Sequence, residues 1–280
     1  MNNRSLEPAM KSHWTLDDVP WARFDNSRVD ADLLAMVKAA AMVEHNGGDY
    51  AVYLCNVFAD DPEFQQVARD WAVEEIQHGK ALAKWAMLAD PAFDFDTAFK
   101  KFTDGFHLPI EATASVRGSK CGELVARCVV ETGTSSYYTA LAEATDEPVL
   151  KDVCRRIAAD EFRHYKLFYA YLKRYLEREP LGVLGRLKVV LGRLVESEDD
   201  ELPYAYYAAN GSGAYDRRRF GAAYARRAYS YYRPWHVERG IAMLFKAAGL
   251  KPHGRLTLAL ARLVYRFIRV RSRRLAAAGA

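Results

Sequence analysis

The stretch WAVEEIQHGK, residues 71–80, interrupts the apolar stripe of an otherwise ordinary amphipathic helix. Glu75 and His78 lie three residues apart, so they share the helix face that also carries Trp71 and Leu82. An unpaired charge in a protein core is strongly unfavourable. These side chains must therefore face water or be neutralised by a partner inside the fold.

The surrounding sequence has the periodicity of a helical bundle. Turn-forming residues divide its first two thirds into four long stretches with three- and four-residue apolar steps and little of the alternation typical of strands. We expect helices at about residues 30–58, 62–88, 121–144 and 148–176, with a long connection between the second and the third. The pattern predicts an all-α protein built on a four-helix bundle.

Each of the four stretches carries a glutamate in the middle of its apolar stripe, and two of them add a histidine three residues later. The set is Glu44, Glu75, His78, Glu131, Glu161 and His164. The first two glutamates are 31 residues apart and the last two are 30 apart, as expected for two similar helical hairpins. Four carboxylates balance two divalent cations, and mixed oxygen and imidazole donors suit iron or manganese. We therefore favour a dinuclear metal site over buried Glu-His pairs or water-facing polar faces.

Two short motifs, EEIQH at residues 74–78 and DEFRH at residues 160–164, resemble those of the ferritin-like di-iron carboxylate superfamily. Within it, they are most similar to the soluble acyl-carrier-protein desaturases, in which an acidic residue precedes each ligand glutamate and an arginine precedes the second histidine. The resemblance covers about residues 30–176. It implies a ferritin-like four-helix bundle with additional C-terminal helices, in which the six residues above bind two iron ions, with Mn/Fe or two manganese ions as alternatives.

The resemblance also implies roles for two further residues. Asp160 would orient a ligand imidazole, which is the usual means of fixing a metal-bound tautomer. Thr134 would handle the proton delivered to bound dioxygen, although a helical threonine can also simply bond to its own backbone. Glu74 lies just off the ligand face and is expected either to support the site or to face solvent.

The activity implied by the resemblance is O2-dependent oxidation by a di-iron oxidoreductase that takes electrons from an external donor. Its substrate would be an organic molecule, such as a carrier-bound acyl chain, that is desaturated or oxygenated. A storage-type or non-catalytic metal-binding protein and an arylamine N-oxygenase are the alternatives. The N-oxygenases usually add a histidine ligand, but His45 points about 100° away from Glu44 around its helix, so we expect it at the surface or in a supporting position.

Gly47 and Gly48 depart from an uninterrupted first helix. They are expected to kink it, or to leave room for a substrate beside the metals.

The charge of the chain is unevenly distributed. From residue 214 onward there are 16 lysines and arginines against two acidic residues. We expect an N-terminal arm at residues 1–29, the bundle at residues 30–178, and a basic, Tyr- and Arg-rich helical extension at residues 179–280. Within the extension, helices are expected at about residues 181–196, 217–232 and 255–275, and a loop at residues 198–216, with breaks at Pro234, Pro252 and Gly254.

A basic surface of this kind suits an acidic partner. Two partners are favoured: an acidic carrier protein or redox protein, or an anionic membrane surface. A nucleic acid is a third candidate, which we do not expect. The alternative is a solvated helix face that packs on the bundle and binds no partner. A homodimer is a further candidate assembly.

Cysteine usage and hydropathy indicate the cellular environment of the protein. Cys55, Cys121, Cys128 and Cys154 form no CxxC pair, so neither a disulfide framework nor a thiolate metal site is indicated. No apolar run has the length of a signal peptide or a membrane span. We therefore expect a soluble, cytoplasmic protein.

Overall fold

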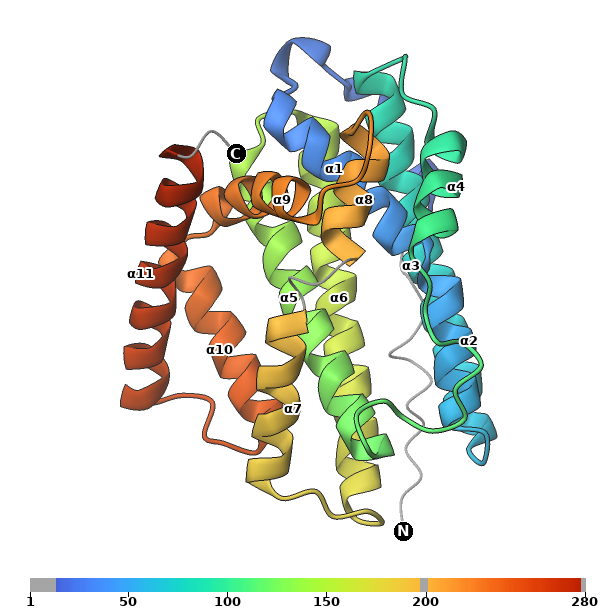
Figure 1. Cartoon of the computed structure of the whole chain (residues 1–280), viewed down its shortest axis with the longest axis vertical. Helices are drawn as coiled ribbons and strands as arrows, with labels where there is room; N and C mark the ends of the chain where they lie inside the picture. Colours follow the sequence, from blue (N-terminus) through green and yellow to red (C-terminus); the bar gives the residue numbers. More distant parts are fainter. Residues whose placement is uncertain (1–13, 197–200, 278–280) are drawn as a thin grey trace.

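The computed structural model describes residues 14–196 and 201–277, and these residues form helices and connections without any β-strand. The all-α helical bundle predicted from the sequence is confirmed (Figure 1). The helices are α1 (Ala31–His45), α2 (Gly47–Val57), α3 (Pro62–Ala89), α4 (Phe95–Gly105), α5 (Lys120–Ala144), α6 (Pro148–Leu176), α7 (Val183–Glu196), α8 (Glu201–Asn210), α9 (Arg217–Tyr231), α10 (Pro234–Ala248) and α11 (Arg255–Ala277).

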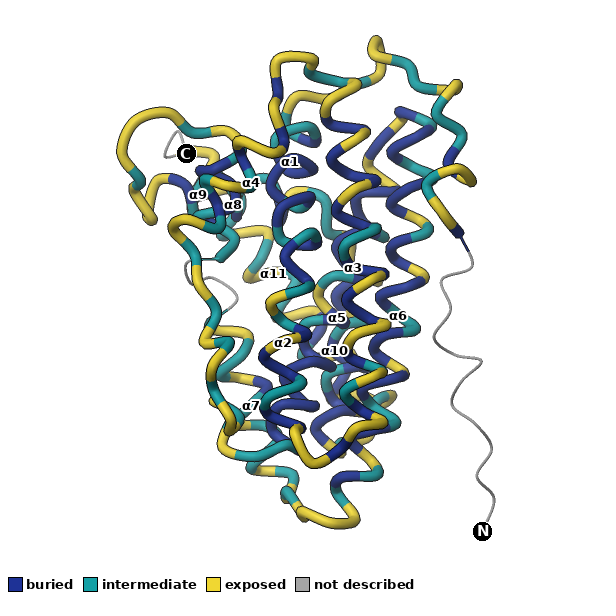
Figure 2. Tube along the Cα trace, turned by 90° about the vertical axis from the view of Figure 1, so that its right-hand side faces the viewer, coloured by how far each residue is buried: buried dark blue, intermediate teal, exposed yellow. Residues whose placement is uncertain are grey.

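Two helical hairpins face each other in the centre of the molecule. In one, α1 and α2 pack on α3; in the other, α5 packs along α6; and α3 meets α6 between them. Asp61 and Glu147 start α3 and α6, each accepting a hydrogen bond from a backbone N–H in the first turn, with a proline at the first helical position. Buried residues, dark blue in Figure 2, follow the facing sides of these helices.

The first predicted helix is interrupted. The segment predicted as one helix over residues 30–58 forms two, because α1 ends at His45, Asn46 adopts a ψ of 5°, and α2 begins at Gly47; the interruption lies where the two glycines were expected to kink the helix. A Cβ atom on Gly47 would lie only 2.5 Å from the Cβ atom of Glu75 on α3. The glycine therefore lets α2 pass directly against the residue that interrupts the apolar stripe of α3.

The C-terminal region is more helical than the sequence indicated. The helices predicted at residues 181–196, 217–232 and 255–275 correspond to α7, α9 and α11. The loop predicted at residues 198–216 is wrong over α8, because that helix buries Ala205 and Tyr206 in the core beside α1; residues 198–200 lie outside the described residues. The break expected at Pro234 is present, because α9 ends at Tyr231 and Pro234 occupies the first turn of α10, where it needs no backbone donor; α10 itself was not predicted. The sequence also missed α4 within the long connection.

The N-terminal arm packs on the bundle where it is described. Residues 14–28 contain three short 3-10 turns, and Trp14 and Val19 are only 5% and 3% exposed. Residues 1–13 of the predicted arm lie outside the described residues. Among the described helices, none combines the length and hydrophobicity that crossing a bilayer requires.

Candidate metal centre

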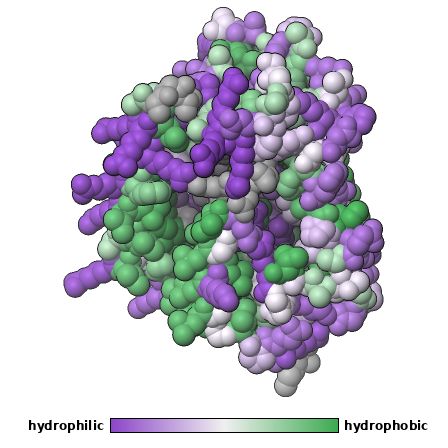
Figure 3. Space-filling view, in the orientation of Figure 1, coloured by the Kyte–Doolittle hydropathy of each residue, from purple (hydrophilic) through white to green (hydrophobic). Residues whose placement is uncertain are grey.

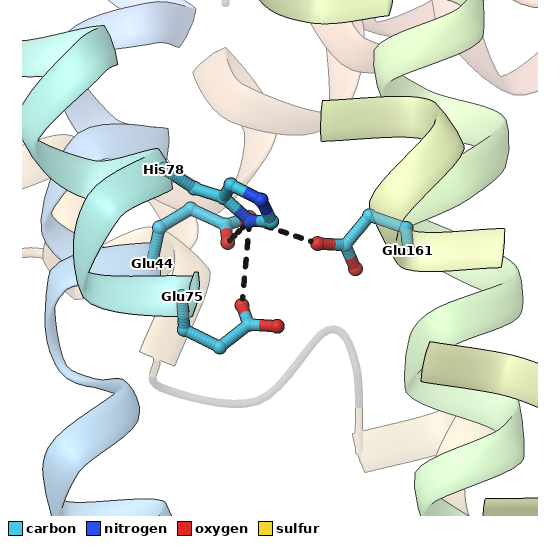
Figure 4. Close-up of side chains that lie close together, drawn as sticks. All are labelled: Glu44, Glu75, His78 and Glu161. Carbon is cyan, nitrogen blue, oxygen red and sulfur yellow. Dashed lines mark ion pairs between the residues drawn. The ribbon is translucent and has the colours of Figure 1, made fainter. Parts of the chain in front are cut away.

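The six residues that interrupt the apolar stripes converge in the core, where all six are buried. One group comprises Glu44, Glu75, His78 and Glu161, whose side chains point toward one another in Figure 4. The second group comprises Glu75, Glu131, Glu161 and His164. Within each group the potential ligand atoms lie within 4.8 Å of one another. Since Glu75 and Glu161 belong to both groups, the arrangement could hold two cations that share two carboxylates.

His78 turns its Nδ1 atom toward the carboxylates of the first group. This nitrogen lies 3.2 Å from Glu161 Oε1, 3.5 Å from Glu44 Oε2 and 4.0 Å from Glu75 Oε2. The three glutamates come from three different helices, α6, α1 and α3. The His78 imidazole of the first hairpin therefore lies close to a carboxylate of the second hairpin, Glu161, as well as to those of its own.

His164 has the equivalent position in the second group. Its Nδ1 atom lies 2.9 Å from Glu75 Oε1, 3.6 Å from Glu131 Oε2 and 3.8 Å from Glu161 Oε1. The ring centroids of His164 and His78 are 5.9 Å apart. The repeated spacing in the sequence therefore corresponds to a repeated arrangement of side chains.

Each of the six residues has at least one buried atom without a hydrogen-bond partner. These atoms are Glu44 Oε2, Glu75 Oε1, His78 Nδ1, both carboxylate oxygens of Glu131, Glu161 Oε1 and His164 Nδ1. A buried polar atom without a partner is destabilising, and a buried carboxylate without one is more so. Cations bound by these oxygen and nitrogen atoms would remove the penalty, so the donor set fits a metal centre.

The cluster holds protons when no cation is bound. Burial, together with the charges of Glu44 and Glu131, raises the pKa of Glu161 to about 8. Burial and the charges of Glu161 and Glu44 likewise raise the pKa of Glu75 well above its usual value. Burial would lower the pKa of His78, but the neighbouring carboxylates of Asp160, Glu161 and Glu44 outweigh burial and raise that pKa well above the ordinary value.

The outer nitrogen of each imidazole is held by an acidic residue of the opposite helix. His78 Nε2 on α3 lies 3.0 Å from Asp160 Oδ2 on α6, and His164 Nε2 on α6 lies 2.8 Å from Glu74 Oε2 on α3. Arg163 joins the two acids, because its Nη2 atom donates to Asp160 Oδ1 at 2.6 Å and to Glu74 Oε2 at 3.1 Å. Glu74, whose position the sequence left open, is buried in this network.

Thr134 makes both kinds of contact that the sequence analysis considered. Its hydroxyl donates to Glu161 Oε2, and it also lies 3.2 Å from the backbone carbonyl of Val130 and 3.4 Å from that of Glu131. The residue therefore lies at the edge of the cluster. His45, in contrast, lies away from the cluster, with its ring edge-on to Phe95 and Phe99.

Two residues around the cluster were not identified from the sequence. Tyr138 donates its hydroxyl to Glu44 Oε1 at 2.6 Å, and it could have been found because it follows Glu131 by two helical turns on the same face. Trp14 donates its indole N–H to Asp160 Oδ2 at 2.7 Å and stacks on His78 with an interplanar angle of 7°. No periodicity connects Trp14 to the bundle, so no sequence signal pointed to it.

Two adjoining cavities lie beside the cluster. The inner one, of about 50 Å³, is lined by Glu44, Glu75, Glu131, Glu161 and Thr134 together with the apolar side chains of Val43, Trp71 and Val130. The outer one, of about 210 Å³, is lined by Phe106, Leu108, Arg117 and Glu196 among others. The residues common to both linings are Tyr50, Arg127, Arg193 and Glu201. Tyr50 donates its hydroxyl to Glu201 at 2.6 Å, so this pair forms part of the wall between the cavities.

The fold and the site together define a class: an all-α bundle whose core presents two Glu-x-x-His motifs and two further glutamates at positions that could hold a pair of cations. The sequence model of the fatty acid desaturases matches residues 8–197, which is more than half of the chain. The chain therefore belongs to the fatty acid desaturase family. A search of curated proteins finds no match. The family match includes α1 to α7 and all six cluster residues but ends before α8.

Proposed function

We propose that this protein is a di-iron oxidoreductase that uses O2 to desaturate or oxygenate an acyl chain. The observation that carries the proposal is the sharing of Glu75 and Glu161 between two buried ligand groups, in a chain of the fatty acid desaturase family. Glu44 and His78 would complete one iron site, and Glu131 and His164 would complete the other. Manganese, whose ligand preference is similar, is the alternative in one or both positions.

The metal pair would supply the chemistry, and the chain would supply positioning. Two iron ions reduced by an external donor would provide the O2 activation that attack on an unactivated C–H bond requires. With the metals bound, Asp160 and Glu74 would accept the outer N–H groups of His78 and His164, which would leave each Nδ1 lone pair free to bind a cation. Arg163 holds both acids, so the two imidazoles are oriented by one connected network.

Thr134 is the protein group best placed to handle a proton beside the cluster. Its hydroxyl contacts Glu161 and lines the inner cavity, where the reacting part of a substrate would lie. The small volume of that cavity and its apolar wall of Val43, Trp71 and Val130 would exclude bulk water from the reaction.

The outer cavity supports a route for the substrate. Arg127 is only 5% exposed, lines both cavities, and has its Nε atom buried without a hydrogen-bond partner. Its guanidinium group lies 4.9 Å from the centre of the Tyr50 ring and 3.9 Å from Glu123. This buried cation would attract the carboxylate of a free fatty acid, or the polar thioester end of a carrier-bound acyl group, while the acyl chain reaches past Tyr50 toward the cluster.

The proposal is tested by a single-turnover reaction. The protein is loaded anaerobically with ferrous iron, reduced, and mixed with O2 in a stopped-flow instrument in the presence of fatty acids or acyl carrier protein thioesters. The expected result is an absorbance transient and a product that has lost two hydrogens or gained one oxygen. Glu161→Gln should abolish both, whereas Glu177→Gln, at the exposed end of the same helix, should leave them unchanged. If iron is oxidised but no oxidised acyl product forms, the proposed activity is contradicted and the function is metal binding or storage.

A further inference from the structure

The C-terminal helix α11 carries three stripes, not the two of an ordinary amphipathic helix. Its first stripe is the buried one, where Thr257 and Ala261 are covered and Val264 and Ile268 pack in a small cluster with residues of α10. The helix contacts α10 and α9 through this side. The remaining two stripes of α11 face away from the protein.

The second stripe is apolar and exposed. Leu256, Leu263, Phe267 and Val270 are 67%, 64%, 59% and 40% exposed. Their spacing of seven, four and three residues places them on one side of the helix. At 1.5 Å per residue this stripe is about 21 Å long. Single exposed apolar residues are common, but a continuous row of this length indicates an interaction surface.

The third stripe is basic and lies directly beside the second. Arg255, Arg262, Arg266, Arg269 and Arg273 are exposed and occupy the same side of the helix, about 100° from the apolar row. None of these five arginines forms an ion pair with any residue in the described ranges 14–196 and 201–277. Their charges are therefore available to a partner.

Helix α7 extends the apolar surface. Leu184, Leu191 and Val195 are 83%, 62% and 73% exposed and lie on one side of that helix. Figure 3 shows hydrophobic side chains gathered over α11 and α7 on a single face, with hydrophilic side chains projecting from the edge of the molecule beyond α11. We call this surface the apolar-basic face, made of the exposed apolar rows of α7 and α11 and the arginine row of α11.

We propose that the apolar-basic face binds the surface of an anionic lipid bilayer. A helix that lies in a membrane interface places its apolar side chains among the acyl chains and its arginines at the level of the headgroups, which is the arrangement of the two exposed stripes of α11. Each basic side chain near the surface is attracted to anionic lipid, and the two contributions add.

Charge argues against a second copy of the chain as the occupant. A symmetric interface brings the same surface of both copies together, so the arginine rows would oppose each other. The two helices of the face, α7 and α11, contain only Glu196 as an acidic counterpart, and its carboxylate already pairs with Arg117 at 2.6 Å. An acidic carrier protein would satisfy the arginines but would leave two rows of leucine, valine and phenylalanine in water. Acyl chains satisfy those rows directly.

The position of α7 connects this face to the cavities. Arg193 and Glu196 of α7 line the outer cavity, while Leu191 and Val195 of the same helix belong to the apolar-basic face. Bilayer binding would therefore hold the outer cavity close to a source of acyl chains. This last step rests on the proposed function, whereas bilayer binding itself does not.

The test is vesicle flotation of the full chain at two salt concentrations. The vesicles are pure phosphatidylcholine or phosphatidylcholine with about one third phosphatidylglycerol. We expect binding only to the anionic vesicles, weakened by salt. Leu263→Ser with Phe267→Ser and, separately, Arg262→Gln with Arg266→Gln should each reduce the partition coefficient at least about tenfold.

Matched controls use exposed residues on other helices. Val73→Ser with Met87→Ser removes two exposed apolar side chains from α3, and Arg155→Gln with Arg178→Gln removes two exposed charges in or just after α6. Both should bind vesicles like the parent protein. Binding that is equal for neutral vesicles, or that falls equally in the controls, would overturn the proposal.

Two further outcomes would also overturn it by giving the face to another occupant. One is a dimer, seen by sedimentation, that dissociates in Leu263→Ser with Phe267→Ser while vesicle binding is absent. The other is salt-dependent binding of acyl carrier protein without vesicle binding. Iron content and single-turnover activity are measured on the same samples, so failure of membrane binding and failure of the proposed oxidation are distinguishable.

Discussion

At the scale of single residues, the two histidines exchange partners across the bundle. His78 belongs to α3 but is oriented by Asp160 of α6, and His164 belongs to α6 but is oriented by Glu74 of α3. Each acidic residue directly precedes the cluster glutamate of its own helix. Each of the two acidic doublets therefore supplies one residue that faces the cluster and one that holds the imidazole of the opposite helix. Trp14 and Arg163 add hydrogen bonds to the same acids.

Replacing Asp160 by asparagine should weaken metal binding without unfolding the protein. The amide cannot supply the negative charge that supports His78, and comparable losses behind metal ligands typically reduce affinity about 10- to 100-fold. Competition with a chromophoric chelator measures the affinity. Asp152→Asn, two turns earlier on α6 and paired with Arg156, is the control. Equal metal affinities for the two variants would show that Asp160 does not support His78 in metal binding.

Metal binding at pH 7 should release protons from the cluster. The pKa of Glu161 is about 8 in the absence of metal, so most of this carboxyl group is protonated at pH 7 and must ionise to bind a cation. Apparent affinity should therefore rise as the pH increases from 6 to 8. Calorimetric titration in buffers of different ionisation enthalpy measures the number of protons released, and a buffer-independent enthalpy would contradict the expectation.

Most residues of the candidate site could be predicted because they break a pattern. A glutamate in the middle of an apolar stripe conflicts with burial, and the repeated Glu-x-x-His spacing identified the conflict as coordinated. Tyr138 and Trp14 break no pattern, because an aromatic residue in a core needs no special explanation. Their hydroxyl and indole N–H groups acquire a role only through tertiary contacts with Glu44 and Asp160.

At the scale of elements, the two adjacent glycines of α2 differ in their surroundings. Gly47 faces Glu75, and a Cβ atom there would lie 2.5 Å from its Cβ atom and 3.2 Å from its Cγ atom. A Cβ atom on Gly48 would meet only Ile76 Cδ1, at 3.9 Å, an ordinary contact. The two glycines were expected to kink the helix or to leave room for a substrate; the helix is interrupted before Gly47, and the space beside this glycine is occupied by Glu75.

The two glycine substitutions should have opposite effects. Gly47→Ala forces α2 away from Glu75 and should lower the free energy of unfolding by about 1–3 kcal/mol while reducing the metal content. Gly48→Ala relieves the entropic disadvantage of glycine in a helix and should raise it by up to about 1 kcal/mol. Denaturant unfolding with metal analysis checks both, and similar values for the two variants would refute the close approach of α2 to α3.

Elements with their own periodicity were predictable, and elements held by tertiary contacts were not. The long helices α3, α5 and α6, and the extent of α7, α9 and α11, follow from apolar spacing and turn residues. Helix α8 lies between segments rich in acidic residues and in glycine, and it is helical because Tyr206 and Tyr207 are buried in the core. Local sequence does not encode that burial, so a loop was the natural expectation.

At the scale of the whole molecule, a metal pair should govern stability. Four carboxylates at the centre of the bundle repel one another unless protons or cations neutralise them. Ligands that bind only the native state stabilise it in proportion to the logarithm of their concentration relative to the dissociation constant. Removing metal with a chelator should therefore lower the unfolding temperature.

The size of that shift should depend on pH. The pKa of Glu161 is raised from 4.5 to about 8, so its contribution to the stability of the metal-free protein is complete below pH 4.5 and is lost as the pH rises through 8. The difference in unfolding temperature between metal-bound and metal-free protein should thus widen from pH 6 to pH 8. Scanning calorimetry at several pH values measures it, and a constant or narrowing difference would contradict the arrangement of charges.

The central claim is that the shared glutamates hold two metal ions in one cluster. The most direct measurement is the number of iron ions per chain after anaerobic loading and gel filtration, for the parent protein, Glu75→Ala and Glu177→Gln. We predict about two ions per chain for the parent and for Glu177→Gln, and a marked loss for Glu75→Ala. Fewer than one ion per chain in the parent, or an unchanged content in Glu75→Ala, would contradict the account.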